Sequence, residues 1–375
     1  MNKVRESEYL EWARSHGNIK YSLALSGVPP VDVSLLSPSV DDFTMVADNE
    51  YGWAPLLERI AHRYGVEPNN VVLAHGTSMA NHLACAALVE VGDHVLIERP
   101  VYDPLVAVPR YLGCEVGFFE RREEDGYALD AGRVEAAITP KTRLVILSNL
   151  HNPTGAVVNR AELESLAQLA ESHDLHVLVD EVYLEWIYAA GKDPEIRSAI
   201  NVSPRFVTTR SLTKVFGLAA LRAGWILAET ELATRMRRLN GLFASSMSHP
   251  AERLAARTFE HAKTLLEKQR KRVARNRSVV TKFIESRSEL SWVQPDAGTV
   301  GFVRLDGGDV DGLVERLLAK DSLVTPGRLF GASDHFRIGL GMEIEQLNEG
   351  LKRLGAVLSE GRAGYELRTN SISDC

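Results

Sequence analysis

The sequence predicts an α/β protein with a large domain, built on a mostly parallel seven-stranded sheet sandwiched by helices, and a smaller α+β domain. Short apolar runs alternate with helix-like segments from about residue 70 to residue 230. This alternation is typical of a parallel sheet covered on both faces. After residue 250, a long helix-like stretch and a few short strands replace it. We therefore expect the large domain at residues 40–280 and the small domain at 1–39 plus 281–375.

The strands of the large domain are expected at short runs of mainly apolar residues. They are Val71–Ala74, His94–Ile97, Glu115–Phe119, Leu144–Leu147, His176–Val179, Phe206–Thr209 and Gly224–Ala228. Helices are expected before and between these runs, where apolar residues recur at helical spacing. They cover residues 56–64, 77–91, 103–112, 130–138, 160–173 and 195–201.

The small domain is expected to use both ends of the chain. Residues 4–16 form an amphipathic helical pattern and Tyr21–Leu25 is strand-like. A long helix should follow Pro250 and reach about Ser288. The elements expected after it are strands near Ser291–Val293, Gly301–Arg304 and His335–Ile338 and helices at 310–320 and 343–359. The polar residues 361–375 should be loosely held.

The composition excludes several classes of protein. The net charge of −7 gives no general attraction to nucleic acid or to anionic membranes. Three cysteines cannot form a disulfide framework and show no metal-ligand spacing, so we expect no metal site. No apolar run approaches membrane-spanning length, and the charged first residues do not resemble a signal peptide. We therefore expect a cytoplasmic protein without nucleic-acid or membrane partners.

One basic run departs from this balance. Lys268–Lys282 holds seven basic residues and no acidic ones. A nucleic-acid surface would account for the run, but a solvated helix face is favoured because the rest of the chain is acidic.

The chemistry centres on the stretch from Ser211 to Trp225. Lys214 follows a strand-like run in apolar surroundings, which lower the pKa of a lysine and make its neutral amine a nucleophile toward carbonyls. Ser211, Thr213 and Arg222 suit a phosphate monoester. A phosphate-bearing aldehyde held as a Schiff base, pyridoxal phosphate (PLP), matches this set. Solvated charges near a turn would explain the stretch taken alone.

Further candidates stand at the carboxyl ends of the expected strands, where α/β sheets bind ligands. Gly76, Thr77 and Ser78 open a helix whose N-terminus suits a phosphate, although a glycine turn with a helix cap is the simpler reading. Tyr102 could stack on a flat ring or simply pack. Asn152, in Asn-Pro-Thr-Gly, could present its amide to a ring oxygen or merely form a tight turn.

A carboxylate ends the fifth expected strand. Asp180 would be costly to bury without a cation, and a protonated pyridine nitrogen is such a cation. Tyr183 could bind the phenolic oxygen of the same ring. A structural pair between Asp180 and an arginine is the competing interpretation.

Taken in order, Asn152-Pro-Thr-Gly, Asp180-Glu-Val-Tyr and Ser211-Leu-Thr-Lys with Arg222 resemble the class I/II aminotransferases of PLP fold type I, the aspartate aminotransferase-like superfamily. The resemblance extends from about Ser26 to an arginine motif near the C-terminus. It implies PLP-dependent transfer of the amino group of an L-α-amino acid to a 2-oxo acid. A C–S β-lyase or another carbanion-type PLP enzyme shares these motifs and stays open. A PLP-fold ligand sensor is disfavoured by the intact lysine site.

The resemblance also implies roles for single residues. Lys214 would form the Schiff base and carry the proton, and Asp180 would pair with the ring nitrogen. Tyr183 and Asn152 would bind the ring oxygen, and Tyr102 would stack on the ring. The residues implied for the phosphate end are Gly76, Thr77, Ser78, Ser211, Thr213 and Arg222.

Two further residues come from the resemblance alone. Tyr51 matches a tyrosine that reaches the phosphate of the neighbouring subunit, which implies a homodimer with shared active sites. Arg337, in His-Phe-Arg-Ile-Gly, matches the arginine that binds the α-carboxylate of the substrate. Asn152 and Gly27 are expected beside that carboxylate.

The sequence departs from the family pattern in two places. Ala220 stands where the family usually has glycine, two residues before the phosphate arginine. No motif supplies a second arginine for a side-chain carboxylate, which disfavours aspartate and glutamate as donors. Ser26 and Trp53, with Gly27, are expected on the wall around the substrate side chain.

Overall fold

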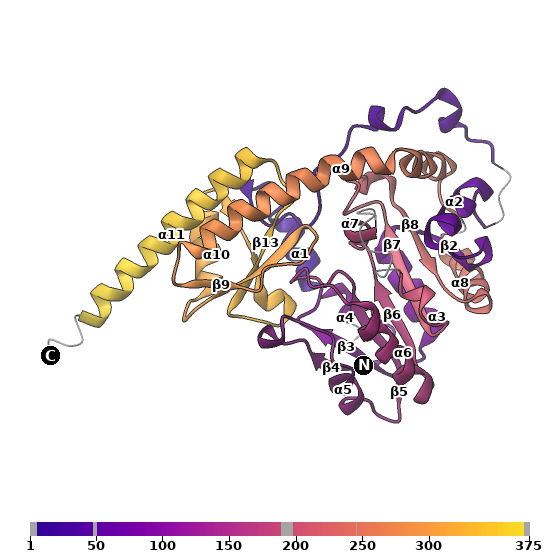
Figure 1. The fold of residues 1–375 in the computed structure, drawn as a ribbon, viewed down its shortest axis with the longest axis horizontal. Coiled ribbons are helices and arrows are strands. Elements are labelled where there is room, and N and C mark those ends of the chain that lie inside the picture. The colour runs from indigo at the N-terminus through magenta and orange to yellow at the C-terminus, as the bar shows by residue number, and fades with distance from the viewer. Residues whose placement is uncertain (1–5, 48–50, 189–197, 245, 371–375) are drawn as a thin grey trace.

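The computed structural model describes residues 6–47, 51–188, 198–244 and 246–370, without the side chains of 361–370. The molecule is elongated, with a large and a small domain side by side (Figure 1). Helix α9 (His249–Glu285) runs along both of them. The expected domain boundary at residue 280 thus falls inside this helix.

The large domain contains the expected mostly parallel sheet of seven strands. The strands are β2 (Val71–His75), β3 (His94–Arg99), β4 (Glu115–Glu120), β5 (Thr142–Ser148), β6 (His176–Asp180), β7 (Phe206–Ser211) and β8 (Ala223–Leu227). Their order in the sheet is β2-β8-β7-β6-β5-β3-β4. Only the β8 pairings are antiparallel. The carboxyl ends of β5, β6 and β7 therefore lie together in the middle of the sheet.

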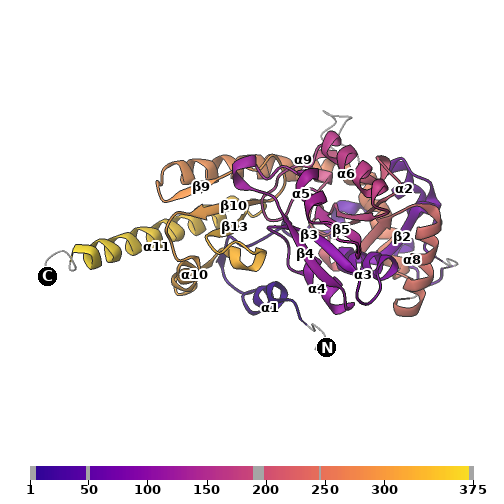
Figure 2. The ribbon, with the colours of Figure 1, turned by 90° about the horizontal axis from the view of Figure 1, so that it is seen from below.

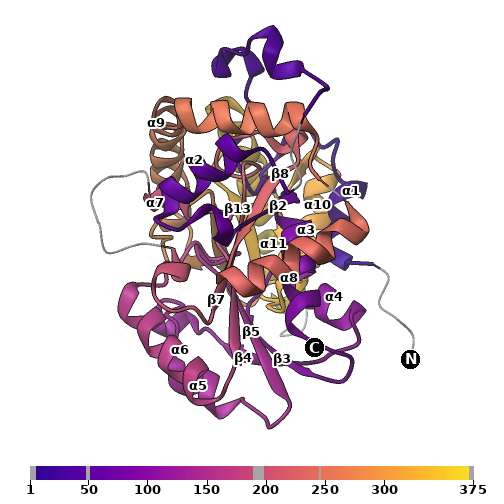
Figure 3. The same ribbon diagram turned by 90° about the vertical axis from the view of Figure 1, so that its right-hand side faces the viewer.

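Helices cover both faces of this sheet (Figures 1 and 3). They are α2 (Ala54–Tyr64), α3 (Gly76–Leu88), α4 (Pro104–Tyr111), α5 (Ala131–Ala136), α6 (Arg160–Ser172), α7 (Glu185–Tyr188) and α8 (Thr230–Phe243). The apolar core on one face joins the sheet to α3, α4 and α8. On the other face, two cores join it to α5 and α6 and to α2 and α9.

The small domain combines the N-terminal arm with the C-terminal part, as expected. Its elements are α1 (Glu8–Ser15), β1 (Tyr21–Ser22), β9 (Leu290–Trp292), β10 (Val300–Leu305), α10 (Val310–Leu318), β11 (Ser322–Leu323), β12 (Thr325–Pro326), β13 (His335–Gly339) and α11 (Ile344–Asn370). Four strands form an antiparallel sheet in the order β12-β13-β10-β9, and β1 pairs with β11. Figure 2 shows α1 lying beside α4 at the junction of the domains.

Several expected elements differ from the observed ones. The strand expected at Tyr21–Leu25 has only two residues in β1, because it pairs only with the short β11. Of the helix expected at 195–201, the described part is a 3₁₀ turn at Ala199–Asn201, and the rest lies outside the described residues. Helix α8 was not expected. The polar tail was expected to be loosely held. The backbone of α11 continues to Asn370, since polar composition alone does not end a helix, and residues 371–375 of the tail lie outside the described residues.

The basic run of α9 has structural partners. Arg270 donates to the Trp186 carbonyl at 2.8 Å, and Arg272 pairs with Glu343. Arg277 donates to two backbone carbonyls, each at 2.9 Å. The run therefore joins α9 to neighbouring segments. In the described part of the chain, no helix is long and apolar enough to span a membrane, and no three potential metal ligands cluster.

Candidate active site

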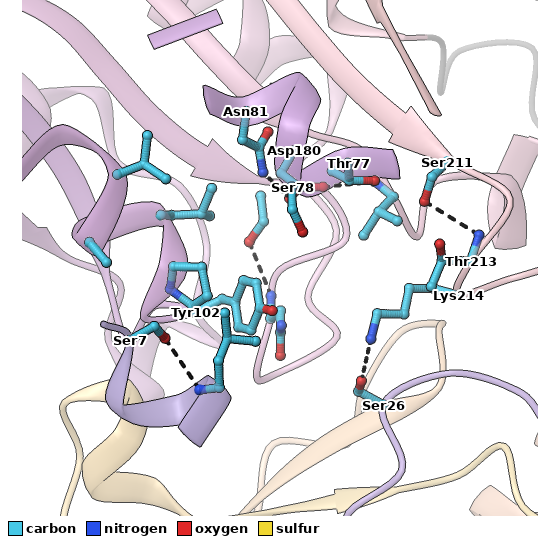
Figure 4. A pocket seen from close by; sticks show the side chains of 18 of the residues that line it. Ser7, Ser26, Thr77, Ser78, Asn81, Tyr102, Asp180, Ser211, Thr213 and Lys214 are labelled. Atoms are coloured by element: carbon cyan, nitrogen blue, oxygen red, sulfur yellow. Dashed lines mark hydrogen bonds between the residues drawn. The ribbon is translucent and has the colours of Figure 1, made fainter. Parts of the chain in front are cut away.

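A cavity of about 500 Å³ opens where the central strands end (Figure 4). We call its strand-end side the inner wall. This wall consists of Thr77, Ser78, Asn81, Ser148, Asn152, Asp180, Tyr183, Ser211, Thr213, Lys214 and Arg222. The side formed by α1, the residues just before it, and α4 is the outer wall. It consists of Glu6, Ser7, Leu10, Glu11, Arg14, Pro104, Leu105, Ala107, Val108 and Tyr111.

Lys214 lies in the loop that follows β7, with its amine inside the cavity. The Nζ atom donates to Oγ of Ser26 at 2.7 Å. Burial lowers the pKa of this amine, and nearby Arg337 also lowers it, whereas Tyr9 and Asp180 act in the opposite direction. The result is a lysine whose neutral form is easier to reach than in water.

Gly27 keeps the chain close to this lysine. A Cβ atom at Gly27 would lie 3.0 Å from the carbonyl oxygen of Lys214 and 3.2 Å from its Cα. Gly27 is not among the lining residues, whereas Ser26 is. Gly27 therefore supports the lysine loop from behind, while Ser26 contacts the amine itself.

Asp180 is the last residue of β6 and is 5% exposed. Its carboxylate accepts from the Asn81 side chain at 3.0 Å and from the Val182 backbone at 3.1 Å. Burial raises the pKa of Asp180 to about 6, although these hydrogen bonds lower it. Among the described residues, no arginine pairs with Asp180, and Arg210 on the neighbouring strand pairs with Glu181 instead.

The start of α3 and the loop before β8 form a cup of hydrogen-bond donors. A Cβ atom at Gly76, where φ is +76°, would collide with the Arg222 guanidinium. Glycine thus lets the cation approach the helix N-terminus. The Thr77 hydroxyl is buried and has no hydrogen-bond partner among the described residues. Ser211 accepts from the Thr213 backbone at 3.3 Å. Such donors at a helix N-terminus fit a phosphate.

Aromatic and amide groups complete the cavity. Tyr102, just before α4, lines it and contacts Tyr9 edge-on at 5.0 Å between ring centroids. Tyr183 donates its hydroxyl hydrogen to the Ser26 carbonyl oxygen, 2.8 Å away. Asn152 accepts from Arg337 at 3.0 Å through its amide oxygen, and its amide nitrogen faces no described acceptor.

Arg337 on β13 is fully buried behind this layer. Its guanidinium donates to Asn152 and, at 2.7 Å, to the Tyr9 hydroxyl. Its Nε atom has no hydrogen-bond partner among the described residues. None of its hydrogen-bond partners among the described residues is a carboxylate, so an anionic group would be a favourable partner.

Five expected site residues do not line this cavity. Gly27, Gly76 and Arg337 lie behind residues that line it, whereas Tyr51 and Trp53 lie elsewhere. Tyr51 is 49% exposed and lies under the guanidinium of Arg237. Trp53 contacts His249 and Arg253. Within one chain, neither lines the cavity, and a contact of Tyr51 with a second subunit stays a prediction.

The sequence motifs did not reveal several residues that the fold brings to the site. Asn81 follows Thr77 by one helical turn, and that spacing could have identified it. Tyr9, Glu6, Glu11 and Arg14 arrive with the N-terminal arm. Nothing in their local sequence indicates where the arm docks.

The arm is held in place at both of its sides. Ser7 and the Tyr9 backbone donate to the Asp103 carboxylate at the start of α4, and Glu8 pairs with Arg328.

Arg14, the one arginine of the outer wall, pairs with Glu11 at 2.5 Å. Its charge is therefore largely compensated.

Pyridoxal phosphate fits this donor set. The amine of Lys214 matches its aldehyde, the buried Asp180 its ring nitrogen, and the cup around Thr77 its phosphate. The Gly76 backbone leaves the room that the Arg222 guanidinium occupies.

Comparison with known proteins agrees with this site. The family model of aminotransferase class I and II matches residues 49–354. The chain is 30% identical to arginine–pyruvate transaminase of Pseudomonas aeruginosa over 322 residues, covering 82% of this chain and 81% of the relative. It is 31% identical to capreomycidine synthase of Streptomyces vinaceus over 339 residues, covering 89% and 86%.

Solved structures show the same fold. A PLP-dependent aminotransferase from Streptococcus suis superimposes with a TM-score of 0.88 at 26% identity, covering 96% of this chain and 98% of that one. The fold is therefore PLP fold type I. The family match spans most of the chain, and the protein thus belongs to the class I and II aminotransferases, as a PLP-dependent transaminase.

Proposed function

We propose that Lys214 binds the cofactor as a Schiff base and then moves the proton between the substrate α-carbon and the cofactor. The observation that carries this is a buried lysine with a lowered pKa in one cavity with a buried, raised-pKa Asp180. When bound, the cofactor supplies an electron sink for the α-carbanion. Asp180 would keep the ring nitrogen protonated, because a buried carboxylate favours a cation beside it.

The other residues bind and orient. Arg337 would hold the α-carboxylate of the substrate through its unused Nε and through the guanidinium nitrogens that now contact Asn152 and Tyr9. Asn152 would donate its free amide hydrogens to the ring oxygen, with Tyr183 beside it. Tyr102 would cover the ring. The residues proposed for the phosphate are Gly76, Thr77, Ser78, Ser211, Thr213 and Arg222.

Product analysis tests the reaction. Purified enzyme, an amino acid and a 2-oxo acid should yield a new amino acid in amounts equal to the new oxo acid. Release of ammonia with pyruvate would instead indicate a β-lyase. A cyclised product would instead indicate a PLP-dependent cyclase.

We further propose that the amino donor has a long cationic side chain, as in arginine. The similarity to an arginine–pyruvate transaminase supports this. The outer wall supports it as well, since Leu10, Leu105 and Val108 offer an apolar surface to a methylene stem. Glu6 and Glu11 line the same wall and would attract the cationic head.

Charge at this wall favours a cation over an anion. The Arg14 guanidinium pairs with Glu11. Glu6 adds a second carboxylate, and no described contact compensates it. The remaining net charge is one negative unit, so a dicarboxylate substrate would meet repulsion there.

A donor panel tests this substrate class. Arginine, lysine, leucine and aspartate should be compared at one concentration with pyruvate as acceptor. Arginine or lysine should give the highest kcat/KM and aspartate the lowest. Aspartate as the best donor would contradict the proposed cationic substrate while leaving transamination intact.

A homodimer with shared active sites is also proposed. Apolar residues of the segment before α2 and of the end of α8 are exposed, among them Val40, Phe43, Met45, Val46, Leu242 and Phe243. In Figures 1 and 3 the first segment lies over α9, on the outside of the domain. Such a surface favours burial against a second copy.

Subunit mixing tests sharing of the site. Lys214→Ala and Tyr51→Ala enzymes should each be impaired, and mixing them should restore activity, because one site of the hybrid keeps both residues. A fully active monomer in sedimentation, or mixing without recovery, would contradict this proposal.

A cytoplasmic location is proposed too, in keeping with the free thiols Cys85 and Cys114.

A further inference from the structure

Asn81 is a polar side chain of the inner wall that reaches Asp180 from another element. Asn81 on α3 is 6% exposed and donates from its amide nitrogen to Oδ2 of Asp180 at 3.0 Å (Figure 4). Its amide oxygen accepts from the Thr209 hydroxyl at 2.5 Å. Thr209 is fully buried. The three side chains form a chain of hydrogen bonds that ends on the carboxylate.

The fold explains how these residues meet. Asp180 on β6 and Thr209 on β7 are direct neighbours in the sheet, so their side chains share a face. Helix α3 packs on that face. Asn81 lies one turn after Thr77 and therefore on the same side of the helix. One helix face thus serves both the phosphate cup and the Asp180 carboxylate.

The hydrogen bonds have a fixed direction. An ionised carboxylate only accepts, so Asn81 must turn its amide nitrogen toward Asp180. Its oxygen then faces Thr209, whose hydroxyl supplies the hydrogen. An apolar side chain at position 81 would remove a buried donor from Oδ2 and leave the Thr209 hydroxyl without this acceptor.

We propose that Asn81, supported by Thr209, is a positioning residue that keeps the Asp180 carboxylate ionised and aimed at the ring nitrogen of the cofactor. This inference rests on the cofactor site proposed above. The other titratable groups that act on Asp180 or respond to it are Lys214, Glu181, Tyr102 and Tyr183. None of them donates a described hydrogen bond to this carboxylate, whereas Asn81 does.

Nitrogen-15 NMR of the holoenzyme tests the proposal. The enzyme is loaded with pyridoxamine phosphate labelled at the ring nitrogen, and the signal is followed against pH. The wild-type ring nitrogen should stay protonated through neutral pH. Asn81→Leu should lower its apparent pKa by about one unit, because a hydrogen bond to a charged group is lost. Thr209→Val should lower it by less, since it removes only the support of Asn81.

An Asp180→Asn background separates positioning from packing. There, Asn81→Leu should shift the ring nitrogen no further, because Asp180 is the group through which Asn81 acts. An equal shift in both backgrounds, or no shift in the single variant, would overturn the proposal. If Asn81→Leu does not fold, Asn81→Ser answers the same question with a smaller side chain. Wild-type protein that binds no pyridoxamine phosphate would instead overturn the cofactor site, and this inference with it.

Discussion

The two walls of the cavity are built in opposite ways. On the inner wall, Asp180 is 5% exposed and is fixed by hydrogen bonds from other elements of the large domain. On the outer wall, the side chains of Arg14 and Glu11 are 71% and 56% exposed, and they pair with each other. The inner wall is therefore set by the core of the sheet. On the outer wall, Leu105 of α4 belongs to that core as well, whereas the exposed side chains of α1 can change without disturbing it.

This difference assigns the two walls different tasks. Groups that act on the cofactor need low dielectric and fixed geometry, which buried strand ends provide. Groups that select a side chain need only complementary shape and charge, which an attached arm can supply. Inner-wall variants should therefore lower the rate with every substrate, and outer-wall variants should change the ranking of substrates.

The largest effect is expected at Lys214. Lys214→Ala removes both the Schiff-base amine and the proton carrier, so turnover should fall roughly 10⁴-fold or more with every donor. Steady-state rates measure this, and a visible absorption band of non-covalently bound PLP serves as the control for an intact site. Wild-type turnover in this variant would show that Lys214 is neither the Schiff-base amine nor the proton carrier.

A smaller loss is expected at Arg337, which is buried behind the cavity lining. Arg337→Gln should lower kcat/KM about 100-fold or more, because the α-carboxylate would lose a buried charged partner. PLP affinity should change much less, since Arg337 contacts Asn152 and Tyr9 rather than the phosphate cup. Substrate and cofactor titrations compare the two losses, and equal losses would argue against an α-carboxylate site.

In the cofactor-free protein, the buried Asp180 should make the free energy of unfolding depend on pH. Burial raises the pKa of Asp180 from 3.8 to about 6, so the native state binds a proton more tightly than the unfolded chain. Stability should therefore fall as pH rises from about 4 to 6. Relative to wild type, Asp180→Asn should gain up to about 3 kcal/mol across this window.

Urea unfolding of both cofactor-free proteins at pH 4.5 and pH 7 measures this gain. If the two proteins differed in free energy of unfolding by the same amount at both pH values, burial of the Asp180 charge would not be what destabilises the wild type. Added PLP should reverse the ranking, because the wild-type carboxylate then has its cation.

The smallest effect is expected on the outer wall. Glu6→Gln with Glu11→Gln should lower kcat/KM for arginine by about tenfold and leave leucine nearly unchanged, since charge pairs near a surface are weak. Glu8→Gln is the matched control, because Glu8 lies on the same helix but pairs with Arg328 and does not line the cavity. Equal losses for arginine and leucine would show that the carboxylates of Glu6 and Glu11 do not select a cationic donor.

The same contrast explains what the sequence could predict. The seven strands, the position of Asp180 at a strand end and the lysine loop follow from periodicity and from motifs ordered along the chain. The arm could not be placed, because Tyr9 meets Arg337 across 328 residues of sequence. Asn81 was missed since its partners Asp180 and Thr209 lie on other elements. Helix α8 was missed although its hydrophobic pattern was present in the sequence.

The central claim is that Lys214 is the amine that binds the cofactor. Borohydride reduction of the PLP-loaded enzyme, followed by peptide mass spectrometry, tests it directly, because reduction makes a lysine–cofactor bond permanent. We expect the pyridoxyl group on the peptide that contains Lys214 and on no other. Modification of a different lysine, or none after reduction of loaded protein, would contradict the account.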